Sequence, residues 1–187
     1  TTPMFEAAPP NFVTEPLPYF LDTILQAVNG SVFVRQVERG NVVVCFYPRG
    51  PADRMQTRAP VSPEKIPIAL AHAARVAPML KSAQAIRVWS GIEGYLPDML
   101  PVMGWSRTQK NLLHAFGFCG HGFQLSPGVG YTLAEMLDEG SARIPIDAFA
   151  IDRFEKLQPD EERLTGEFDA ALASAAMRPG NLEAARR

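Results

Sequence analysis

A glycine-rich segment in the second half of the chain carries the strongest indication of chemistry. Five glycines fall within fourteen residues from Gly117 to Gly130, around the run Gly120-His121-Gly122-Phe123-Gln124. Glycine admits positive φ and lets the backbone approach a ligand closely. The apolar run that follows predicts a helix over residues 129–137, whose N-terminus would present N–H groups and a partial positive charge. The spacing therefore predicts a seat for an anionic or electron-rich group; the alternative is a structural turn.

A second block lies upstream, with Trp89, Gly91, Pro97-Asp98, Pro101 and Gly104 in order. The two blocks together resemble motifs of the D-amino acid oxidase / sarcosine oxidase superfamily, the W-x-G … P-D-x-x-P-x-x-G block and the flavin-contact motif G-F-x-G-H-G-F. Residues 12–18 resemble the strand that enters the family's substrate domain, and residues 146–154 resemble its usual ending. The order and spacing of all four blocks agree over residues 11–154.

The resemblance implies FAD as the cofactor, held mainly by an N-terminal Rossmann-like half. The C-terminal half would supply the substrate sheet and then return to cover the flavin ring. No G-x-G-x-x-G follows a strand and opens a helix in this sequence. We therefore expect an N-terminal Rossmann-type FAD-binding chain or fragment as a partner, and a small amine or amino acid as the substrate. The implied activity is that of an amine dehydrogenase or oxidase, with hydride passing from the amine-bearing carbon to the flavin.

The resemblance also assigns the residues that contact the cofactor, which are Gly91, Gly120, His121, Gly122, Phe123 and Gln124. His121 is a candidate proton carrier by residue type, but the family uses this position for packing and backbone contact. Some sarcosine oxidases attach the flavin through a cysteine near the position of Gly91, so its absence here indicates non-covalent FAD. The pattern assigns no catalytic residue and no metal ligand.

The substrate side departs from the family in two places. Gln124 stands where sarcosine oxidases carry a lysine, and Glu93 lies near an arginine that grips the substrate carboxylate in many relatives. Glu93 could instead pair with a substrate ammonium or guanidinium; the alternative is a solvated side chain. We also expect Phe46 and Tyr47 to wall the substrate pocket. Further candidates for a carboxylate grip are Arg35, Gln36 and Arg49, with a surface position as the alternative.

The elements around these residues indicate an α+β fold. The patterns predict a helix over 19–28, a hairpin of strands 31–37 and 41–47, a helix over 66–80, a strand over 82–89, and short strands at 100–103 and 112–116. We expect a mixed antiparallel sheet with helices, followed by the return segment of a split FAD-binding fold. The expected divisions are a substrate-binding portion (1–82), a flavin-contacting segment (83–154) and a helical or flexible tail (155–187), with a helix over 165–177.

Composition narrows the class of protein. The 187 residues are 47% hydrophobic and 20% charged, with a net charge of −2, so they suit a globular core and offer no basic footprint for nucleic acid. No apolar run is long enough to cross a membrane, and two distant cysteines suggest a reducing, cytoplasmic setting. Two other functions stay open: a non-catalytic assembly subunit, and an N-terminal hydrolase that uses Thr1 as its nucleophile. An arbitrary start is the favoured explanation of Thr1, because Pro3, Pro9 and Pro10 break up the strand that such a nucleophile needs.

Overall fold

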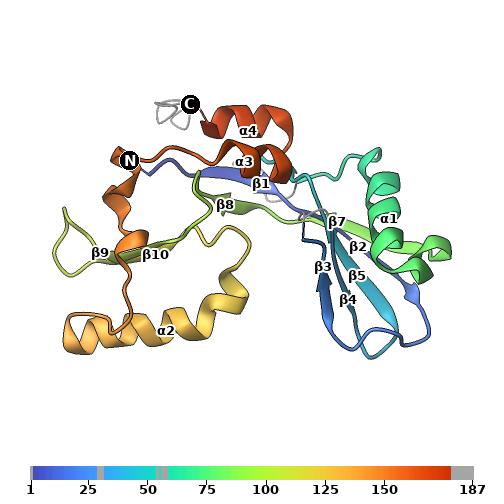
Figure 1. Ribbon diagram of the computed structural model, residues 1–187, viewed down its shortest axis with the longest axis horizontal. Coiled ribbons are helices and arrows are strands. Elements are labelled where there is room, and N and C mark those ends of the chain that lie inside the picture. Colours follow the sequence, from blue (N-terminus) through green and yellow to red (C-terminus); the bar gives the residue numbers. More distant parts are fainter. Residues whose placement is uncertain (1, 29–31, 54, 56–58, 178–187) are drawn as a thin grey trace. The chain divides into compact units, whose positions relative to one another are not determined.

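The computed structural model describes residues 2–28, 32–53, 55 and 59–177, which divide into two compact units (Figure 1). The sheet unit comprises residues 6–93 and 161–175. The hairpin–helix unit comprises residues 94–160, together with 2–5 and 176–177. The division falls at residue 93 instead of 82, because the strand over 85–90 pairs with the sheet. The α+β class is confirmed.

A five-stranded antiparallel sheet forms the sheet unit, in the order β3-β4-β5-β2-β7. Its strands are β2 (Pro10–Pro16), β3 (Ile24–Gln26), β4 (Val32–Gln36), β5 (Asn41–Phe46) and β7 (Ala85–Ser90). The predicted hairpin is confirmed, since β4 and β5 are antiparallel neighbours with Gln36 opposite Val42. The predicted strand over 82–89 corresponds to β7.

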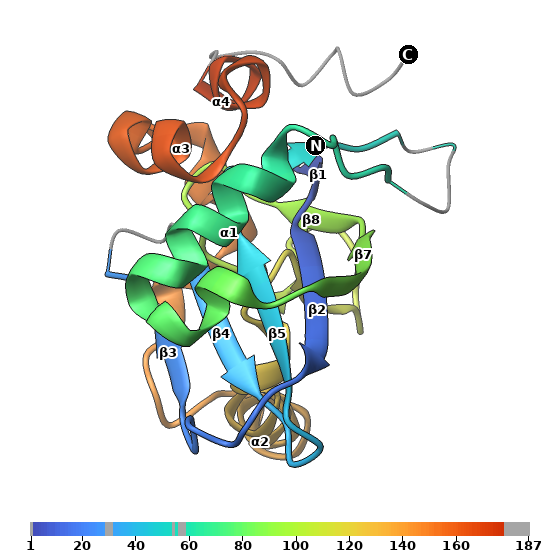
Figure 2. The ribbon, with the colours of Figure 1, turned by 90° about the vertical axis from the view of Figure 1, so that its right-hand side faces the viewer.

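Helix α1 (Lys65–Val76), followed by the 3-10 helix η1 (Pro78–Ser82), lies across one face of this sheet (Figure 2). Alternate residues of the strands are buried against it, and Val42, Val44 and Phe46 share a core with Ala69 and Ala73. The intervening residues point the other way because side chains alternate along a strand. This second surface, called the open face, includes the half-buried residues Asn11, Val13, Phe33, Val43 and Cys45.

The prediction of a helix over residues 19–28 was wrong. The segment bends after Pro18 and forms the edge strand β3, in which Leu25 pairs with Val34 of β4. The side-chain oxygen of Gln36 accepts hydrogen bonds from the N–H groups of Phe20 and Leu21, at 2.8 and 3.1 Å. These non-local partners outweigh the apolar spacing, which by itself resembles a helix.

The hairpin–helix unit contains the antiparallel pair β9 (Val102–Trp105) and β10 (Leu113–Phe116), followed by helix α2 (Gly122–Glu139). Two short 3-10 helices close it, η2 (Asp147–Phe149) and η3 (Ile151–Glu155). The strand pair confirms the two predicted short strands. Helix α2 begins at Gly122, earlier than the predicted 129, so the glycine-rich segment itself forms the first turns of the helix.

The remaining elements are short. They are β1 (Phe5–Ala8), β6 (Gly50–Pro51), β8 (Glu93–Tyr95), α3 (Glu161–Glu167) and α4 (Ala170–Met177). β1 and β6 pair antiparallel. The tail helix predicted over 165–177 is divided into α3 and α4 at residues 168–169. Within the described ranges, none of the helices combines the length and the apolar character that crossing a bilayer requires.

Candidate functional site

The turn that precedes α2, called the glycine turn (residues 116–121), has an unusual backbone. Gly117, Cys119 and Gly120 all have positive φ, at 70°, 52° and 82°. The N–H of His121 donates to the carbonyl of Phe118 at 2.9 Å and closes the turn. Positive φ is accessible to glycine without steric cost, so the two glycines permit this path directly.

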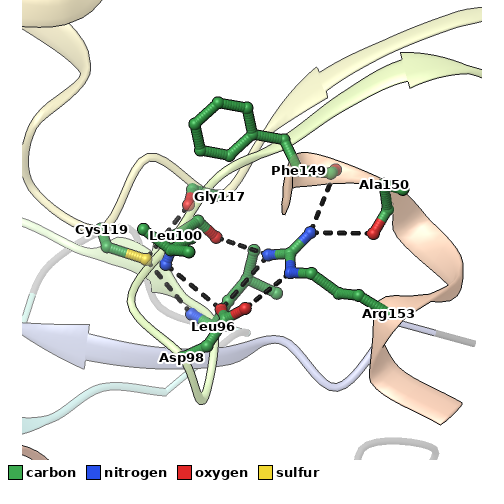
Figure 3. A network of polar contacts seen from close by, with 8 residues as sticks. All are labelled: Leu96, Asp98, Leu100, Gly117, Cys119, Phe149, Ala150 and Arg153. Carbon is green, nitrogen blue, oxygen red and sulfur yellow. Dashed lines mark hydrogen bonds and ion pairs between the residues drawn. The ribbon is translucent and has the colours of Figure 1, made fainter. Parts of the chain in front are cut away.

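Contacts with Leu96 hold the glycine turn in place (Figure 3). A Cβ atom on Gly117 would approach Cδ1 of Leu96 to 2.5 Å, closer than real Cβ contacts come. The N–H of Leu96 donates to Sγ of Cys119 at 3.4 Å, and that thiol donates to the carbonyl of Gly117 at 3.1 Å. Gly117 is therefore required by space as well as by φ, and the buried Cys119 has a structural role.

An ion pair between Arg153 and Asp98 joins the second motif to the chain's 3-10 segment (Figure 3). Arg153 binds both carboxylate oxygens, at 2.6 Å from Nε and 3.2 Å from Nη2. The guanidinium also donates to the carbonyls of Leu100, Phe149 and Ala150. Both side chains are largely buried, at 13% and 11% exposed, so the paired charges and the five hydrogen bonds stabilise one another. From the sequence, residues 146–154 resembled the usual ending of the family, and this ion pair was not predicted.

The N-terminus of α2 lies directly after the glycine turn. The first helical hydrogen bond runs from the N–H of Leu125 to the carbonyl of His121, at 3.1 Å. The N–H groups of Gly122, Phe123 and Gln124 precede it and have no acceptor within the helix, so they carry the positive end of the helix dipole. Phe123 is 97% exposed and Gln124 is also exposed. Three of the predicted cofactor residues, Gly122, Phe123 and Gln124, thus supply backbone donors at the start of α2.

Pro127 lies inside α2, although proline usually interrupts a helix. Proline has no N–H, so it leaves the carbonyl of Phe123 without its usual helical donor. The hydroxyl of Ser126 donates to that carbonyl at 2.8 Å instead. The substitution of a side-chain donor lets α2 continue through Pro127. Gly140, with a φ of 81°, ends the helix as a left-handed cap.

A second polar group lies on the sheet unit, around the end of β5. The Tyr47 hydroxyl accepts a hydrogen bond from Nη2 of Arg49 at 3.0 Å. Burial raises the pKa of Tyr47, and it raises the pKa of the Cys45 thiol to about 11. The positive charge of Arg49 lowers both pKa values, and the carboxylate of Glu93 raises both. The Glu93 carboxylate therefore lies within electrostatic range of Tyr47 and Cys45. The structure brings together two of the predicted substrate residues, Glu93 and Tyr47.

Two other predicted substrate residues have structural positions. Phe46 is 1% exposed and belongs to the core under α1, on the opposite face of the sheet from Cys45. Gln36 is 7% exposed, and its side-chain amide bonds only to backbone groups of the surrounding turns, among them those of Leu21 and Gly40. Strand alternation buries Phe46, and backbone groups saturate Gln36. Neither placement supports the predicted substrate contact.

The remaining predicted residues differ in their exposure to solvent. Gly91 is exposed, and a Cβ atom there would meet nothing within 4 Å, which leaves room for a ligand beside the backbone. Arg35 is exposed on β4. Arg49 is 3% exposed and pairs with Glu167, so the alternative of a surface position does not apply to it. Thr1 lies outside the described residues.

Comparison with known proteins decides the family. The model of the FAD dependent oxidoreductase family matches residues 4–136, which is most of the chain. The chain belongs to this family. Its curated relatives include the β subunit of sarcosine oxidase from Rhizobium meliloti (strain 1021), 28% identical over 146 residues. Glycine oxidase from Geobacillus kaustophilus (strain HTA426) is 27% identical over 141 residues. These matches cover 78% and 75% of this chain.

Solved structures show the same fold. L-proline dehydrogenase from P. horikoshii superposes with a TM-score of 0.75 at 22% identity, over 90% of this chain and 42% of that one. Glycine oxidase from Geobacillus kaustophilus gives a TM-score of 0.70 at 21% identity, over 82% of this chain and 40% of that one. This member of the family spans only 34% of the sarcosine oxidase subunit and 36% of the curated glycine oxidase.

The described residues fit part of what FAD needs. The donors at the start of α2 suit the electron-rich edge of a flavin, because backbone N–H groups and the helix dipole both favour negative charge. The G-x-G-x-x-G turn that would bind the pyrophosphate is absent from this sequence. The start of α2 therefore fits the ring portion of an FAD molecule.

Proposed function

We propose that this chain is the substrate-binding and flavin-covering part of an FAD-dependent dehydrogenase or oxidase that acts on a small amine or amino acid. The observation that carries the proposal is the exposed N-terminus of α2, directly after the glycine turn, in a member of an FAD-dependent family. When bound, FAD supplies the hydride acceptor that converts an amine into an imine. The names of the relatives, sarcosine, glycine and D-amino-acid oxidases, support this substrate class.

The residues at the start of α2 would act on the flavin ring by electrostatics. The N–H groups of Gly122, Phe123 and Gln124 would stabilise negative charge that develops at the N1/C2=O edge when the ring is reduced. Gly120 and His121 would lie along the same edge through their backbone. Gly91 belongs to the sheet unit, and its contact with the flavin stays a prediction from the sequence. No cysteine occupies a position matching covalent attachment, so we propose non-covalent FAD.

Glu93 and Tyr47 would recognise the substrate. Both belong to the sheet unit, and burial, followed by a smaller effect of the Glu93 carboxylate, raises the pKa of the Tyr47 hydroxyl. A carboxylate attracts an ammonium or guanidinium group, and the half-buried position of Glu93 strengthens that attraction relative to bulk water. We therefore propose that the substrate's amino group, or a cationic group elsewhere in it, lies beside Glu93.

An N-terminal Rossmann-type FAD-binding chain or fragment would complete the enzyme. The chain spans 34% of the sarcosine oxidase subunit and lacks the dinucleotide-binding motif. Several apolar side chains of α2 are exposed, including Phe123 at 97%, Tyr131 at 62% and Leu137 at 67%. We propose that the N-terminal segment packs on α2 and covers these side chains, because their burial would remove apolar surface from water.

The test is to purify the native protein and record its visible absorption, its subunit pattern on a denaturing gel and its response to amines. We expect a flavin spectrum, a second FAD-binding segment, and bleaching by a small amine or amino acid. A colourless protein that folds alone would contradict the proposal. A yellow complex that no amine bleaches would instead indicate a non-catalytic assembly subunit, which the departures at Gln124 and Glu93 also fit.

A variant pair tests the substrate residue. Glu93→Gln should raise KM for the amine by roughly tenfold, as expected for the loss of one charge-assisted contact worth about 1.5 kcal/mol. Glu38→Gln is the matched control, because Glu38 is exposed in the turn between β4 and β5. Equal KM values for the two variants would remove Glu93 from the substrate site.

A further inference from the structure

We propose that Glu167 is a positioning residue that orients Tyr47 through Arg49, so that the segment from α3 to α4 (residues 161–177) shapes the substrate surface of the sheet unit. The inference rests on the proposed function, which places Tyr47 beside the substrate. The segment lies outside residues 4–136, the part that the family model matches.

Backbone contacts fix the segment to the sheet unit. The N–H of Arg49 donates to the carbonyl of Glu167 at 2.9 Å, and the N–H of Asp169 donates to the carbonyl of Arg49 at 3.0 Å. Together they form a parallel bridge between Arg49 and Phe168. Lys65 of α1 adds an ion pair to Asp169 at 2.9 Å. The backbone of Arg49 is thus fixed to the segment, independently of the contacts that its side chain makes.

Burial shows that the segment is a packed part of the unit. Leu164, Phe168 and Ala173 are 0%, 1% and 2% exposed. Burying such side chains removes apolar surface from water, which stabilises their docked position. The sequence had suggested a helical or flexible tail here, with no role.

The side chain of Arg49 connects Glu167 of the segment to Tyr47. Nη1 of Arg49 lies 2.8 Å from Oε2 of Glu167, and the two side chains are 4% and 22% exposed. The guanidinium carbon lies 4.1 Å from the centre of the Tyr47 ring and 5.5 Å from that of Phe168. Nη2 donates to the Tyr47 hydroxyl at 3.0 Å. One planar group therefore contacts Glu167, the Tyr47 ring and the Tyr47 hydroxyl.

This arrangement restricts Tyr47 more than strand packing alone would. A guanidinium held by a carboxylate has fewer accessible orientations, and its fixed donors impose a direction on the phenol hydroxyl. The carboxylate of Glu167 also balances the charge of Arg49, which matters because Glu93 acts on the same tyrosine. Without Glu167, the guanidinium would be free to turn toward Glu93 and compete with a cationic substrate.

The experiment compares Glu167→Ala and Glu167→Gln with Glu162→Ala in the complete flavoprotein. Glu162 is an exposed residue on the same helix, so it controls for changes to α3 itself. The first readout is the NMR signal of tyrosine labelled with ¹³C at Cζ, assigned to Tyr47 with Tyr47→Phe. The second is the separation of KM from kcat, repeated in the Tyr47→Phe background.

We expect the Tyr47 signal to move in both Glu167 variants, and more in Glu167→Ala, while Glu162→Ala leaves it unchanged. KM should rise roughly tenfold in Glu167→Ala with little change in kcat, the pattern of lost substrate binding. This rise should vanish in the Tyr47→Phe background, because the two residues act as one unit. A merely structural role would lower stability without this dependence on Tyr47.

An unchanged Tyr47 signal in Glu167→Ala would overturn the inference. A signal that moves while KM stays constant would support the coupling of Glu167 to Tyr47, and would refute the proposed contact between Tyr47 and the substrate. The two failures are therefore distinguishable. Glu167→Gln preserves side-chain size, so it provides the same comparison if Glu167→Ala does not fold.

Discussion

Replacing Gly117 by alanine tests whether the glycine turn is fixed by sterics. Gly117 has a φ of 70°, where a residue with a Cβ atom costs about 1–2 kcal/mol. The added Cβ would lie 2.5 Å from Cδ1 and 3.0 Å from Cγ of Leu96, and overpacking of this kind costs about 1–3 kcal/mol. The free energy of unfolding should therefore fall by roughly 3 kcal/mol, and Tm by about 6–12 °C for a chain of this size.

Substitutions at two further glycines, measured in the same denaturation assay, separate the cost of positive φ from the cost of the contact with Leu96. Gly140 has a φ of 81°, and a Cβ atom added there would meet nothing within 4 Å, so Gly140→Ala should lose only the backbone part, about 1–2 kcal/mol. Gly128 lies inside α2 in open space, so Gly128→Ala should gain about 0.5–1 kcal/mol in helix propensity. If Gly117→Ala is no more destabilising than Gly140→Ala, the steric argument about Leu96 is refuted.

Two other predictions concern charge. Arg153→Ala should lower the free energy of unfolding by about 3–5 kcal/mol, because it leaves the carboxylate of Asp98 largely buried without its partner; Arg107→Ala, at an ion pair with a 68% exposed arginine, should cost less than about 1 kcal/mol in the same urea titration. Burial raises the pKa of the Cys45 thiol to about 11 in the folded chain, against 9.0 as the ordinary value. Its contribution to stability is complete below pH 9.0 and is lost as the pH rises to about 11, so Cys45→Ser should flatten the decline of stability across that range.

Local patterns predicted most of the elements because they record burial directly. The alternation along residues 41–46 specifies a strand with one face in the core, and the structure places Val42, Val44 and Phe46 there. The same alternation places Phe46 on the opposite face of the sheet from Cys45, since neighbours in a strand point to opposite faces. The contact of Phe46 with substrate stays a prediction. The helix expected over 19–28 was wrong because pairing with β4 and capping by Gln36 depend on residues distant in sequence.

The candidate site shows the same division. Glycines at 117 and 120 signal a turn with positive φ from the sequence alone, and the structure has that turn. The start of α2 was misplaced because the glycine-rich run indicated a turn and only the apolar run after it indicated a helix, whereas the helix begins at Gly122. Arg49 resembled any surface arginine in sequence, since Glu167, its partner, is far along the chain.

The sequence by itself determined the family, through two motifs whose residue types and spacing are set by backbone geometry, and it determined the strands whose alternation follows from burial. Only the tertiary structure decided which charges meet. Arg153 with Asp98, and Arg49 with Glu167 and Tyr47, are brought together by packing between distant segments. An ion pair leaves no periodic trace in a sequence, because its energy depends on distance and on burial in the folded state.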